Sequence, residues 1–219
     1  MYGDNPIRQP LSGDGLTLNI QSIFATLQGE GPYVGWPAIF IRLGGCNLAC
    51  SFCDTEFESF QPLKLGDILD TVRRLTTSNQ RLIVITGGEP FLQPIEPLCT
   101  RLLEAGFKVQ IETNGTLYRE LPDAVDIVCS PKNTGKGYFP IRPDLLARVN
   151  AFKFLISAQN TDYSMIGEVG QGQRVPVYVQ PMDEYDAEKN RANLQHATDL
   201  AMEHGYRLCL QLHKIAGIE

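Results

Sequence analysis

Three closely spaced cysteines are the residues of this sequence best suited to chemistry. Cys46, Cys50 and Cys53 follow a Gly-Gly pair in the pattern C-x3-C-x2-C. A structural zinc ion closes a tetrahedron with four protein ligands, whereas a four-iron cluster takes one thiolate per iron. No fourth ligand lies nearby, because the next cysteine is Cys99 and the first histidine is His196. Three thiolates with one open metal position favour a reactive iron-sulfur site, although a zinc site completed by a remote ligand and three unligated cysteines remain open.

A second candidate is the arginine that ends the strand before the cysteines. Arg42 closes the apolar stretch 37–43 and should point toward the mouth of the cysteine site. Its planar guanidinium group can donate two parallel hydrogen bonds to one carboxylate. We therefore favour a role in binding a ligand carboxylate over a partly buried ion pair within the protein. The loop 27–32, with Gln28 and Glu30 between glycines, is either a binding loop or an ordinary hairpin turn.

The elements that must position these residues are strands alternating with helices. The apolar run 82–85 is typical of a strand covered on both faces. Helical periodicity marks 64–75, and His204-Gly205 is a stop signal for a long final helix. We predict strands at 18–24, 37–43, 82–85, 108–111, 125–129, 151–157, 175–179 and 207–214, and helices at 64–75, about 94–105 and about 187–204. This order predicts an α/β fold with a mostly parallel sheet.

Polar clusters follow several of the predicted strands directly. They are Gly87-Gly88-Glu89, Glu112-Thr113-Asn114, Ser130-Pro131-Lys132, Gln180-Pro181-Met182-Asp183 and His213-Lys214. Each alone is an ordinary turn signal. In parallel sheets and barrels, however, sites form at the carboxyl ends of the strands, so together these clusters predict one rim around the cysteine loop.

Length and composition limit the kind of protein. A chain of 219 residues fits one domain, and we expect a flexible lead over 1–17 and a single domain over 18–219. The net charge of −6 argues against a broad nucleic-acid surface. The polar start is unlike a signal peptide, and no apolar run of about 18 residues is present to span a membrane. We therefore expect a cytoplasmic protein with reduced thiols, in which Cys99, Cys129 and Cys209 are core residues.

The cysteine motif resembles a known signature. Cys46, Cys50 and Cys53, with the aromatic Phe52 before the third cysteine, are similar to the motif of the radical S-adenosylmethionine (SAM) superfamily. Gly87-Gly88-Glu89-Pro90 resembles that superfamily's GGEP element. Within it, the chain after about residue 18 resembles the 7-carboxy-7-deazaguanine synthase family of queuosine and 7-deazapurine biosynthesis. The stretches that carry this likeness are 27–31, 37–43, 53–55, 85–90, 111–113, 130–132 and 211–214.

The resemblance implies a fold, a reaction and a set of cofactors. The fold would be a partial or modified (β/α) barrel of mostly parallel strands. The reaction would be a radical ring contraction of 6-carboxy-5,6,7,8-tetrahydropterin to 7-carboxy-7-deazaguanine with loss of ammonia, which makes the protein a carbon-nitrogen lyase. The cofactors would be a 4Fe-4S cluster, SAM and Mg2+. An electron-donating flavoprotein or ferredoxin and a second copy of the chain, forming a homodimer, would be its partners.

The same resemblance implies roles for individual residues. The cluster ligands would be Cys46, Cys50 and Cys53, and the Mg2+ ligand would be Thr55, which could otherwise cap a turn. Contacts to SAM would come from Phe52, Cys53, Asp54, Gly88, Ser130, Pro131, Lys132, Gln180, Pro181, Met182 and Asp183. The substrate would contact Leu27, Gln28, Gly29, Arg42 and Thr86. Further candidates are Glu30, Glu89, Glu112, His213 and Glu219.

Several of these assignments have plain alternatives. Glu30 and Glu112 could be structural ion-pair partners, Lys132 a solvated surface lysine and His213 a structural residue on the last strand. Family members often end in proline, whereas this chain ends in Glu219, which puts a role for the terminal residue in doubt. Competing functions are a radical activase acting on a partner protein, an iron-sulfur electron carrier and a zinc-binding module.

Overall fold

One curved sheet organises the residues that the computed structural model describes, which are 5–77, 81–133 and 135–218. Within them, nine strands lie in the order β3-β1-β2-β4-β5-β6-β7-β8-β9. All neighbours from β2 to β9 pair in parallel, while β1 is antiparallel to both β2 and β3. The strands are β1 (Thr17–Leu27), β2 (Pro37–Leu43), β3 (Gln61–Lys64), β4 (Leu82–Gly87), β5 (Lys108–Thr113), β6 (Val125–Cys129), β7 (Ala151–Ile156), β8 (Val177–Pro181) and β9 (Arg207–Leu208).

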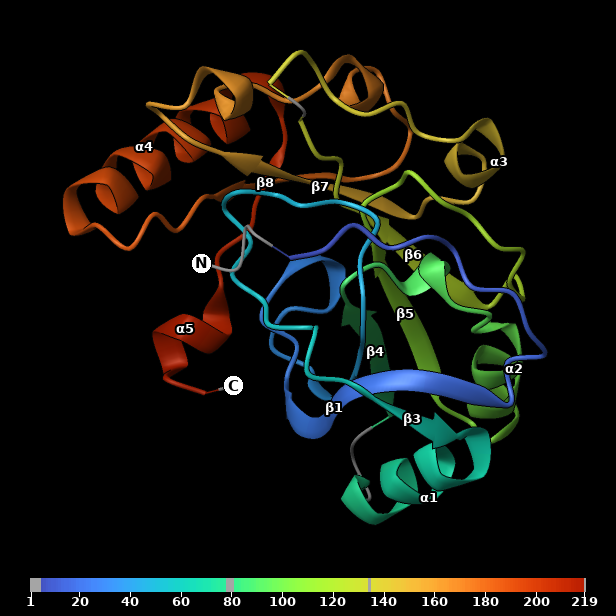
Figure 1. The fold of residues 1–219 in the computed structure, drawn as a ribbon. Helices are drawn as coiled ribbons and strands as arrows, with labels where there is room; N and C mark the ends of the chain where they lie inside the picture. Colours follow the sequence, from blue (N-terminus) through green and yellow to red (C-terminus); the bar gives the residue numbers. More distant parts are fainter. Residues whose placement is uncertain (1–4, 78–80, 134, 219) are drawn as a thin grey trace.

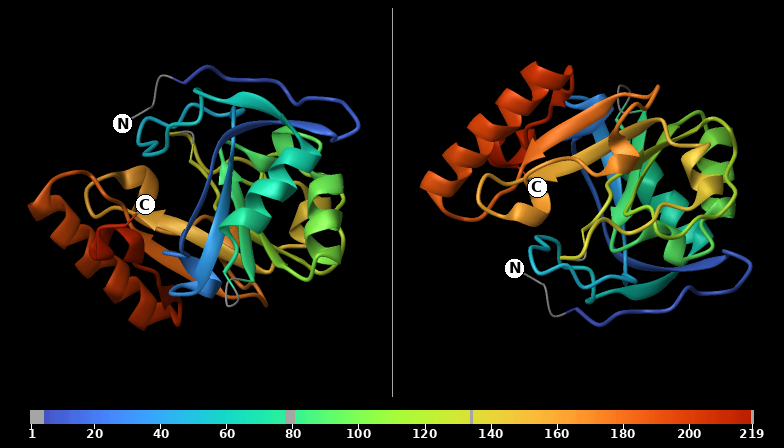
Figure 2. Two further views of the ribbon diagram at one scale, coloured as in Figure 1. Left: turned by 90° about the horizontal axis from the view of Figure 1, so that it is seen from below. Right: turned by 90° about the horizontal axis from the view of Figure 1, so that it is seen from above.

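The helices α1 (Leu65–Leu75), α2 (Glu96–Glu104), α3 (Pro143–Leu146) and α4 (Ala187–His204) lie on the outer side of this sheet (Figures 1 and 2). The short C-terminal helix α5 (Leu212–Ala216) lies at the cavity instead. The 3-10 turns are η1 (Gly31–Tyr33), η2 (Pro90–Leu92), η3 (Thr161–Tyr163) and η4 (Glu168–Gly170). The layout is the mostly parallel α/β partial barrel that the sequence predicts. No helix in the described ranges is long and apolar enough to cross a membrane.

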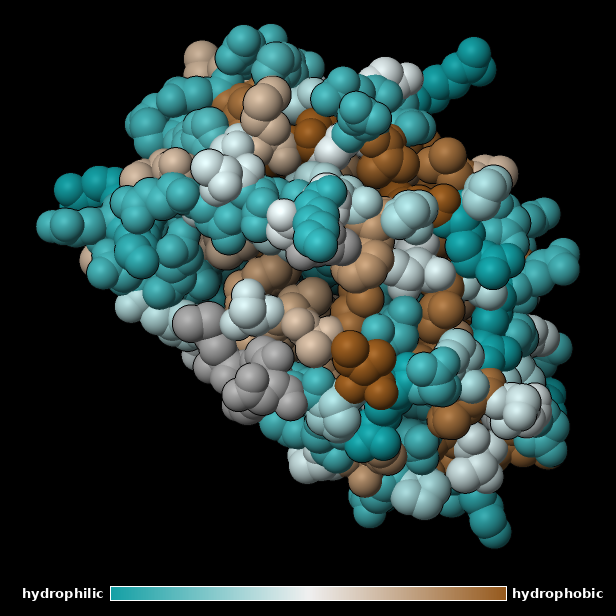
Figure 3. Space-filling view, turned by 45° about the horizontal axis from the view of Figure 1, so that its top comes forward, coloured by the Kyte–Doolittle hydropathy of each residue, from teal (hydrophilic) through white to brown (hydrophobic). Residues whose placement is uncertain are grey.

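The core lies between the sheet and its helices. Residues Leu82–Ile85 of β4 are at most 1% exposed, as expected for a strand covered on both faces. α1 packs through Leu65, Ile68 and Val72, which share one helical face. In Figure 3, the side chains over α4, at the upper left of the view, are mostly hydrophilic. Hydrophobic side chains are exposed mainly in the middle and at the upper right of the same view.

The two ends of α4 are where the sequence predicts them. The Asp186 carboxylate accepts hydrogen bonds from the backbone N–H groups of Glu188 and Lys189, which satisfies donors that the first turn leaves unpaired. Gly205 ends the helix at a φ of 71°, a left-handed conformation that glycine adopts without penalty.

The predicted final strand over 207–214 is wrong beyond its first two residues. β9 ends at Leu208, and α5 begins at Leu212, so His213 lies on a helix and not on a strand. The chain leaves the sheet because its backbone at Leu212 bonds to the loop after β1 and not to β8. The Leu212 N–H donates to the Gly29 carbonyl at 3.0 Å. Alternation of apolar and polar residues could not reveal this long-range contact. The short strand β3, which pairs with β1, was also absent from the prediction.

The described part of the N-terminal segment is draped over the cysteine loop. Ile7 forms a parallel bridge with Cys46, and the Arg8 N–H donates to the Cys46 carbonyl at 2.8 Å. Farther along, the Leu11 N–H donates to the Leu92 carbonyl at 2.7 Å. The Arg8 guanidinium pairs with Glu58, which lies after the cysteine loop. These contacts hold the described part of the N-terminal segment against the cysteine loop and the η2 turn of the same chain.

Candidate active site

A cavity of about 350 Å³ opens at the carboxyl ends of the parallel strands. Its wall combines the cysteine loop, the loop after β1, the exits of β4, β5, β6 and β8, and α5. The predicted site residues that line it are Leu27, Gln28, Glu30, Arg42, Cys46, Cys50, Phe52, Cys53, Asp54, Thr55, Thr86, Gly88, Glu112, Ser130, Lys132, Gln180, Met182, Asp183 and His213. Gly29, Glu89, Pro131 and Pro181 are not on the wall, and Glu219 lies outside the described residues.

All three cysteines of the motif face this cavity. The Cys53 N–H donates to the Cys50 carbonyl at 3.0 Å, which curls the loop so that both side chains turn the same way. Burial raises the pKa of the Cys46 thiol to about 12, and burial also raises the pKa values of Cys50 and Cys53. Thiolates at these positions therefore need a cationic partner such as a metal cluster.

The three thiols are a donor set that fits an iron-sulfur cluster. Cys46, Cys50 and Cys53 line one cavity, and a four-iron cluster takes one thiolate per iron. Among the described residues, no group of three or more His, Cys, Asp or Glu side chains converges closely enough to hold one metal ion.

Gly87 and Gly88, at the end of β4, allow close packing against the start of the cysteine loop. A Cβ on Gly88 would lie 1.8 Å from the Gly45 carbonyl oxygen, and one on Gly87, whose φ is 120°, would lie 2.2 Å from the Leu43 carbonyl oxygen. The adjacent Glu89 N–H donates to the Gly45 carbonyl at 3.0 Å. Because neither residue has a Cβ, the exit of β4 can pack directly on the cysteine loop.

Glu89 is turned away from the cavity. It is fully buried, and its carboxylate accepts from the Phe91 N–H at 3.0 Å, the Thr113 hydroxyl at 2.7 Å and the Asn114 N–H at 2.7 Å. Burial raises its pKa to about 7, against the lowering effect of these hydrogen bonds. These hydrogen bonds join the η2 turn to the exit of β5.

Arg42 has the surroundings expected of an anion clamp. Its guanidinium carbon lies 5.3 Å from the centre of the Phe24 ring, and its Nε is buried without a hydrogen-bond partner. No described residue forms an ion pair with it, so the ion-pair alternative is not supported. A buried donor without a partner costs free energy, which an incoming carboxylate would recover.

Glu30 and Glu112 meet at a residue that the sequence interpretation missed. Lys153, in the middle of β7, donates from Nζ to Glu30 Oε2 and to Glu112 Oε2, the second contact at 2.8 Å. The ion-pair alternative is therefore correct for both glutamates, yet both also line the cavity. A lysine inside the apolar run of β7 was the available signal, because a buried charge needs a partner.

Lys132 is not the solvated surface lysine considered above. Its Nζ donates to the Ser130 carbonyl at 2.8 Å and to the Ser130 hydroxyl at 2.7 Å, and burial lowers its pKa. Next to it, the Phe52 ring meets the Tyr163 ring edge-on with centroids 5.0 Å apart. Together these contacts set the wall between the cysteine loop and the exit of β6.

α5 closes one side of the cavity mouth. Lys214 donates from Nζ to Asp183 at 2.8 Å and to Asp54 at 3.4 Å, so it ties α5 to the exit of β8 and to the cysteine loop. His213 sits against Gly29, where a Cβ would come within 2.1 Å of its Nδ1. This contact explains why a glycine is needed at position 29, which is not itself on the cavity wall.

Comparisons with known proteins agree with this arrangement. The family model of the radical SAM superfamily matches residues 40–130. The 7-carboxy-7-deazaguanine synthase of Rickettsia prowazekii is 56% identical, over 100% of this chain and 96% of its own length. The enzyme of that name from Rhodospirillum rubrum is 43% identical over the whole of both chains. The crystal structure of QueE from Escherichia coli matches with a TM-score of 0.72 at 27% identity, covering 90% of this chain and 95% of that one.

Two such enzymes are similar to this chain over its full length. The superfamily match spans the cysteine loop and the GGEP element, and the structure places the three thiols of that loop on one cavity. The chain therefore belongs to the 7-carboxy-7-deazaguanine synthase family of the radical SAM superfamily.

Proposed function

We propose that the protein is a 7-carboxy-7-deazaguanine synthase, which contracts the ring of 6-carboxy-5,6,7,8-tetrahydropterin with loss of ammonia. The observation that carries this proposal is one cavity lined by three thiols, an arginine with an unpartnered donor and two partly buried carboxylates. A volume of about 350 Å³ lies in the range of small-molecule sites, roughly 300–1,000 Å³. A radical activase would need a mouth open to a protein chain, whereas Lys214 bridges two sides of this one.

Membership in the superfamily implies a 4Fe-4S cluster and SAM as cofactors. Cys46, Cys50 and Cys53 would hold the cluster, which when bound supplies the electron that cleaves the sulfonium of SAM to a 5'-deoxyadenosyl radical. The exits of β4, β6 and β8 would bind SAM, with Gly88, Ser130, Lys132, Gln180, Met182 and Asp183 on the cavity wall. Phe52, Cys53 and Asp54 would contact its adenine, while Pro131 and Pro181 would act only through the backbone.

The opposite part of the wall would bind the substrate. Arg42 would clamp its carboxylate, and Thr86, which pairs with Arg42 across β2 and β4, would supply a hydroxyl beside it. Leu27, Gln28 and the backbone at Gly29 would hold the pterin ring. Glu30 and Glu112 would accept hydrogen bonds from its N–H groups, and His213 would cover it from α5.

We further propose that Mg2+ binds at Thr55. The Thr55 hydroxyl donates to the Asp54 carboxylate at 3.2 Å, and both residues line the cavity. Oxygen donors suit a hard cation, which would bridge the protein to the carboxylate of the substrate. A flavoprotein or ferredoxin as electron donor is proposed on family resemblance, and a homodimer on that resemblance and the polar N-terminal segment. A cytoplasmic location is proposed from the sequence. Light scattering that shows a monomer would remove the homodimer.

The test is anaerobic turnover by reconstituted protein with dithionite and SAM. We expect 5'-deoxyadenosine and 7-carboxy-7-deazaguanine to form together, and both to depend on the carboxypterin. Formation of 5'-deoxyadenosine that does not respond to the carboxypterin would favour the activase. Its complete absence from protein that carries iron and a cluster spectrum would favour the electron carrier.

A further inference from the structure

A buried lysine sits beneath the proposed substrate site, where none of the assignments above uses it. Lys153 is 5% exposed and occupies the middle of β7. Successive strand residues point to opposite faces, so Phe152 and Phe154 enter the hydrophobic core while Lys153 points to the cavity. A buried ammonium is costly unless it is paired, which makes its partners informative.

The partners of Lys153 are the two cavity carboxylates. Its Nζ contacts Oε2 of Glu30 and Oε2 of Glu112, whose side chains are 15% and 16% exposed. The other oxygen of each carboxylate accepts from two amides. Glu112 Oε1 accepts from Gln28 at 2.9 Å and Gln110 at 3.1 Å, and Glu30 Oε1 accepts from Gln180 at 3.2 Å and Gln211 at 2.9 Å.

This network fixes the orientation of the two carboxylates. An ionised carboxylate has about four acceptor positions, and three on each are used by protein donors, so one on each Oε2 remains for a ligand. Among the described residues, Lys153 provides the only ion pair to either glutamate. Two carboxylates with one ammonium leave a single net negative charge at this point of the cavity wall.

We propose that Lys153 is a positioning residue that keeps Glu30 ionised and aims Glu30 and Glu112 at the ligand, so that this wall accepts hydrogen bonds from the N–H edge of a nitrogen heterocycle. The role rests on the proposed function, because it assigns the carboxylates to binding of the pterin ring. Lys153 would act through the glutamates and would not touch the substrate itself.

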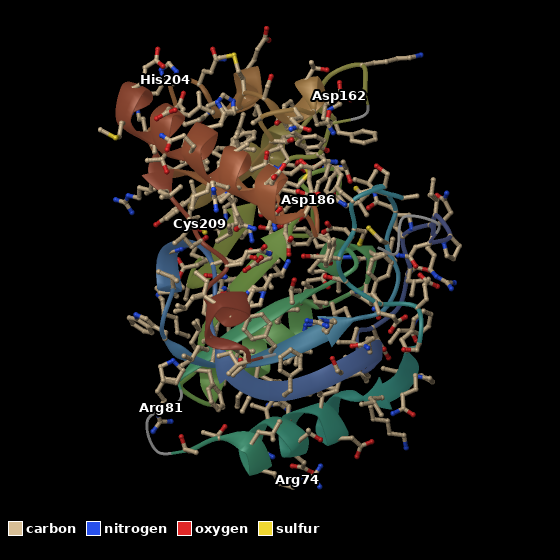
Figure 4. All side chains as sticks on the ribbon, turned by 90° about the vertical axis from the view of Figure 1, so that its left-hand side faces the viewer. Arg74, Arg81, Asp162, Asp186, His204 and Cys209 are labelled. Carbon is tan, nitrogen blue, oxygen red and sulfur yellow. The ribbon has the colours of Figure 1, made fainter. Side chains whose placement is uncertain are left out.

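The charged neighbours support this assignment. Burial by itself would raise the pKa of Glu30, but the charge and hydrogen bond of Lys153, with a hydrogen bond from Gln211 and the charge of His213, lower it to about 2. Cys209, on the segment between α4 and α5 (Figure 4), and Lys132 also face this group. Without Lys153, burial would favour protonation of Glu30.

The experiment compares holoenzymes of the wild type, Lys153→Met, Lys153→Arg and Lys108→Met. Lys108 forms a part-exposed pair with Asp126 at 2.8 Å and is not on the cavity wall, so its variant controls for loss of a lysine charge. Iron content and the cluster spectrum report on the cluster, and SAM binding measured without the carboxypterin reports on the SAM site. KM and kcat for the carboxypterin are measured from pH 6 to pH 9.

Lys153→Met should keep the cluster spectrum and raise KM roughly 10- to 100-fold, the range for a charge-assisted hydrogen bond. Its kcat/KM relative to the wild type should rise with pH, because higher pH ionises the carboxylate that gained a proton. Lys153→Arg keeps the cation, so its ratio to the wild type should be independent of pH even if KM rises. Lys108→Met should match the wild type throughout.

A Lys153→Met enzyme with wild-type KM and an unchanged pH profile would overturn the proposal. If that variant does not fold, Lys153→Arg decides, and a ratio to the wild type that changes with pH would overturn the proposal there. A wild type that makes no 7-carboxy-7-deazaguanine would instead refute the proposed function, so the two failures are distinguishable.

Discussion

Replacing Arg42 with alanine tests the carboxylate clamp. The guanidinium has a buried Nε without a partner and a ring contact with Phe24 at 5.3 Å. A charge-assisted bond to the carboxylate of the substrate should contribute about 1.5–3 kcal/mol, which corresponds to a KM increase of roughly 10- to 100-fold. The lost cation–π contact should lower the free energy of unfolding by about 0.5–1 kcal/mol. Because Arg42 is separate from the thiols, iron content and the cluster spectrum should not change.

The assay is KM and kcat under anaerobic turnover, with denaturant unfolding as the measure of stability. Arg207→Ala is the matched control, since Arg207 lies 5.6 Å from the Tyr178 ring and is not on the cavity wall. It should lose a similar amount of stability and keep the wild-type KM. Arg42→Lys keeps the charge without the fork and should recover only part of the affinity. A KM for Arg42→Ala within twofold of the wild type would refute the clamp.

Three more outcomes follow from contacts in the structure. Gly88→Ala should lower the free energy of unfolding by about 1–3 kcal/mol and reduce iron retention, because the added Cβ would lie 1.8 Å from the Gly45 carbonyl oxygen. Unchanged thermal unfolding and iron content would contradict this prediction. Lys214→Met should destabilise the protein by about 1 kcal/mol at neutral pH and less near pH 2, since Lys214 helps lower the pKa of Asp183 to about 2 against the effect of burial. The stabilisation is present above the unfolded pKa of about 3.8 and is lost as pH falls through about 2, so an equal loss at both pH values in acid unfolding curves would refute it. Cys50→Ala should abolish the reconstituted cluster spectrum while far-UV circular dichroism stays folded; full iron binding by this variant would exclude Cys50 as a ligand.

Much of the fold could be predicted from the sequence because its signals are local. Continuous apolar runs such as Leu82–Ile85 predict buried strands, and helical spacing with Gly205 as a stop signal predicts α4. The strand prediction failed at 209–214, where the Leu212 N–H donates to the Gly29 carbonyl and the chain leaves the sheet. Alternation within a segment holds no information about a competing partner far away in the chain.

The sequence by itself determined the chemistry of the site, since the spacing of Cys46, Cys50 and Cys53 and the Gly-Gly pair at 87–88 are properties of consecutive residues. Only the tertiary structure decided what each charged side chain faces. It turned Glu89 into the protein and left Arg42 without an ion pair to any described residue. It also placed Lys153 between Glu30 and Glu112, and these three residues come from three different parts of the chain. The physical reason is that a buried charge is stabilised by groups that are close in space. The pairing of strands in the sheet determines which groups these are, and the order of residues in the sequence does not.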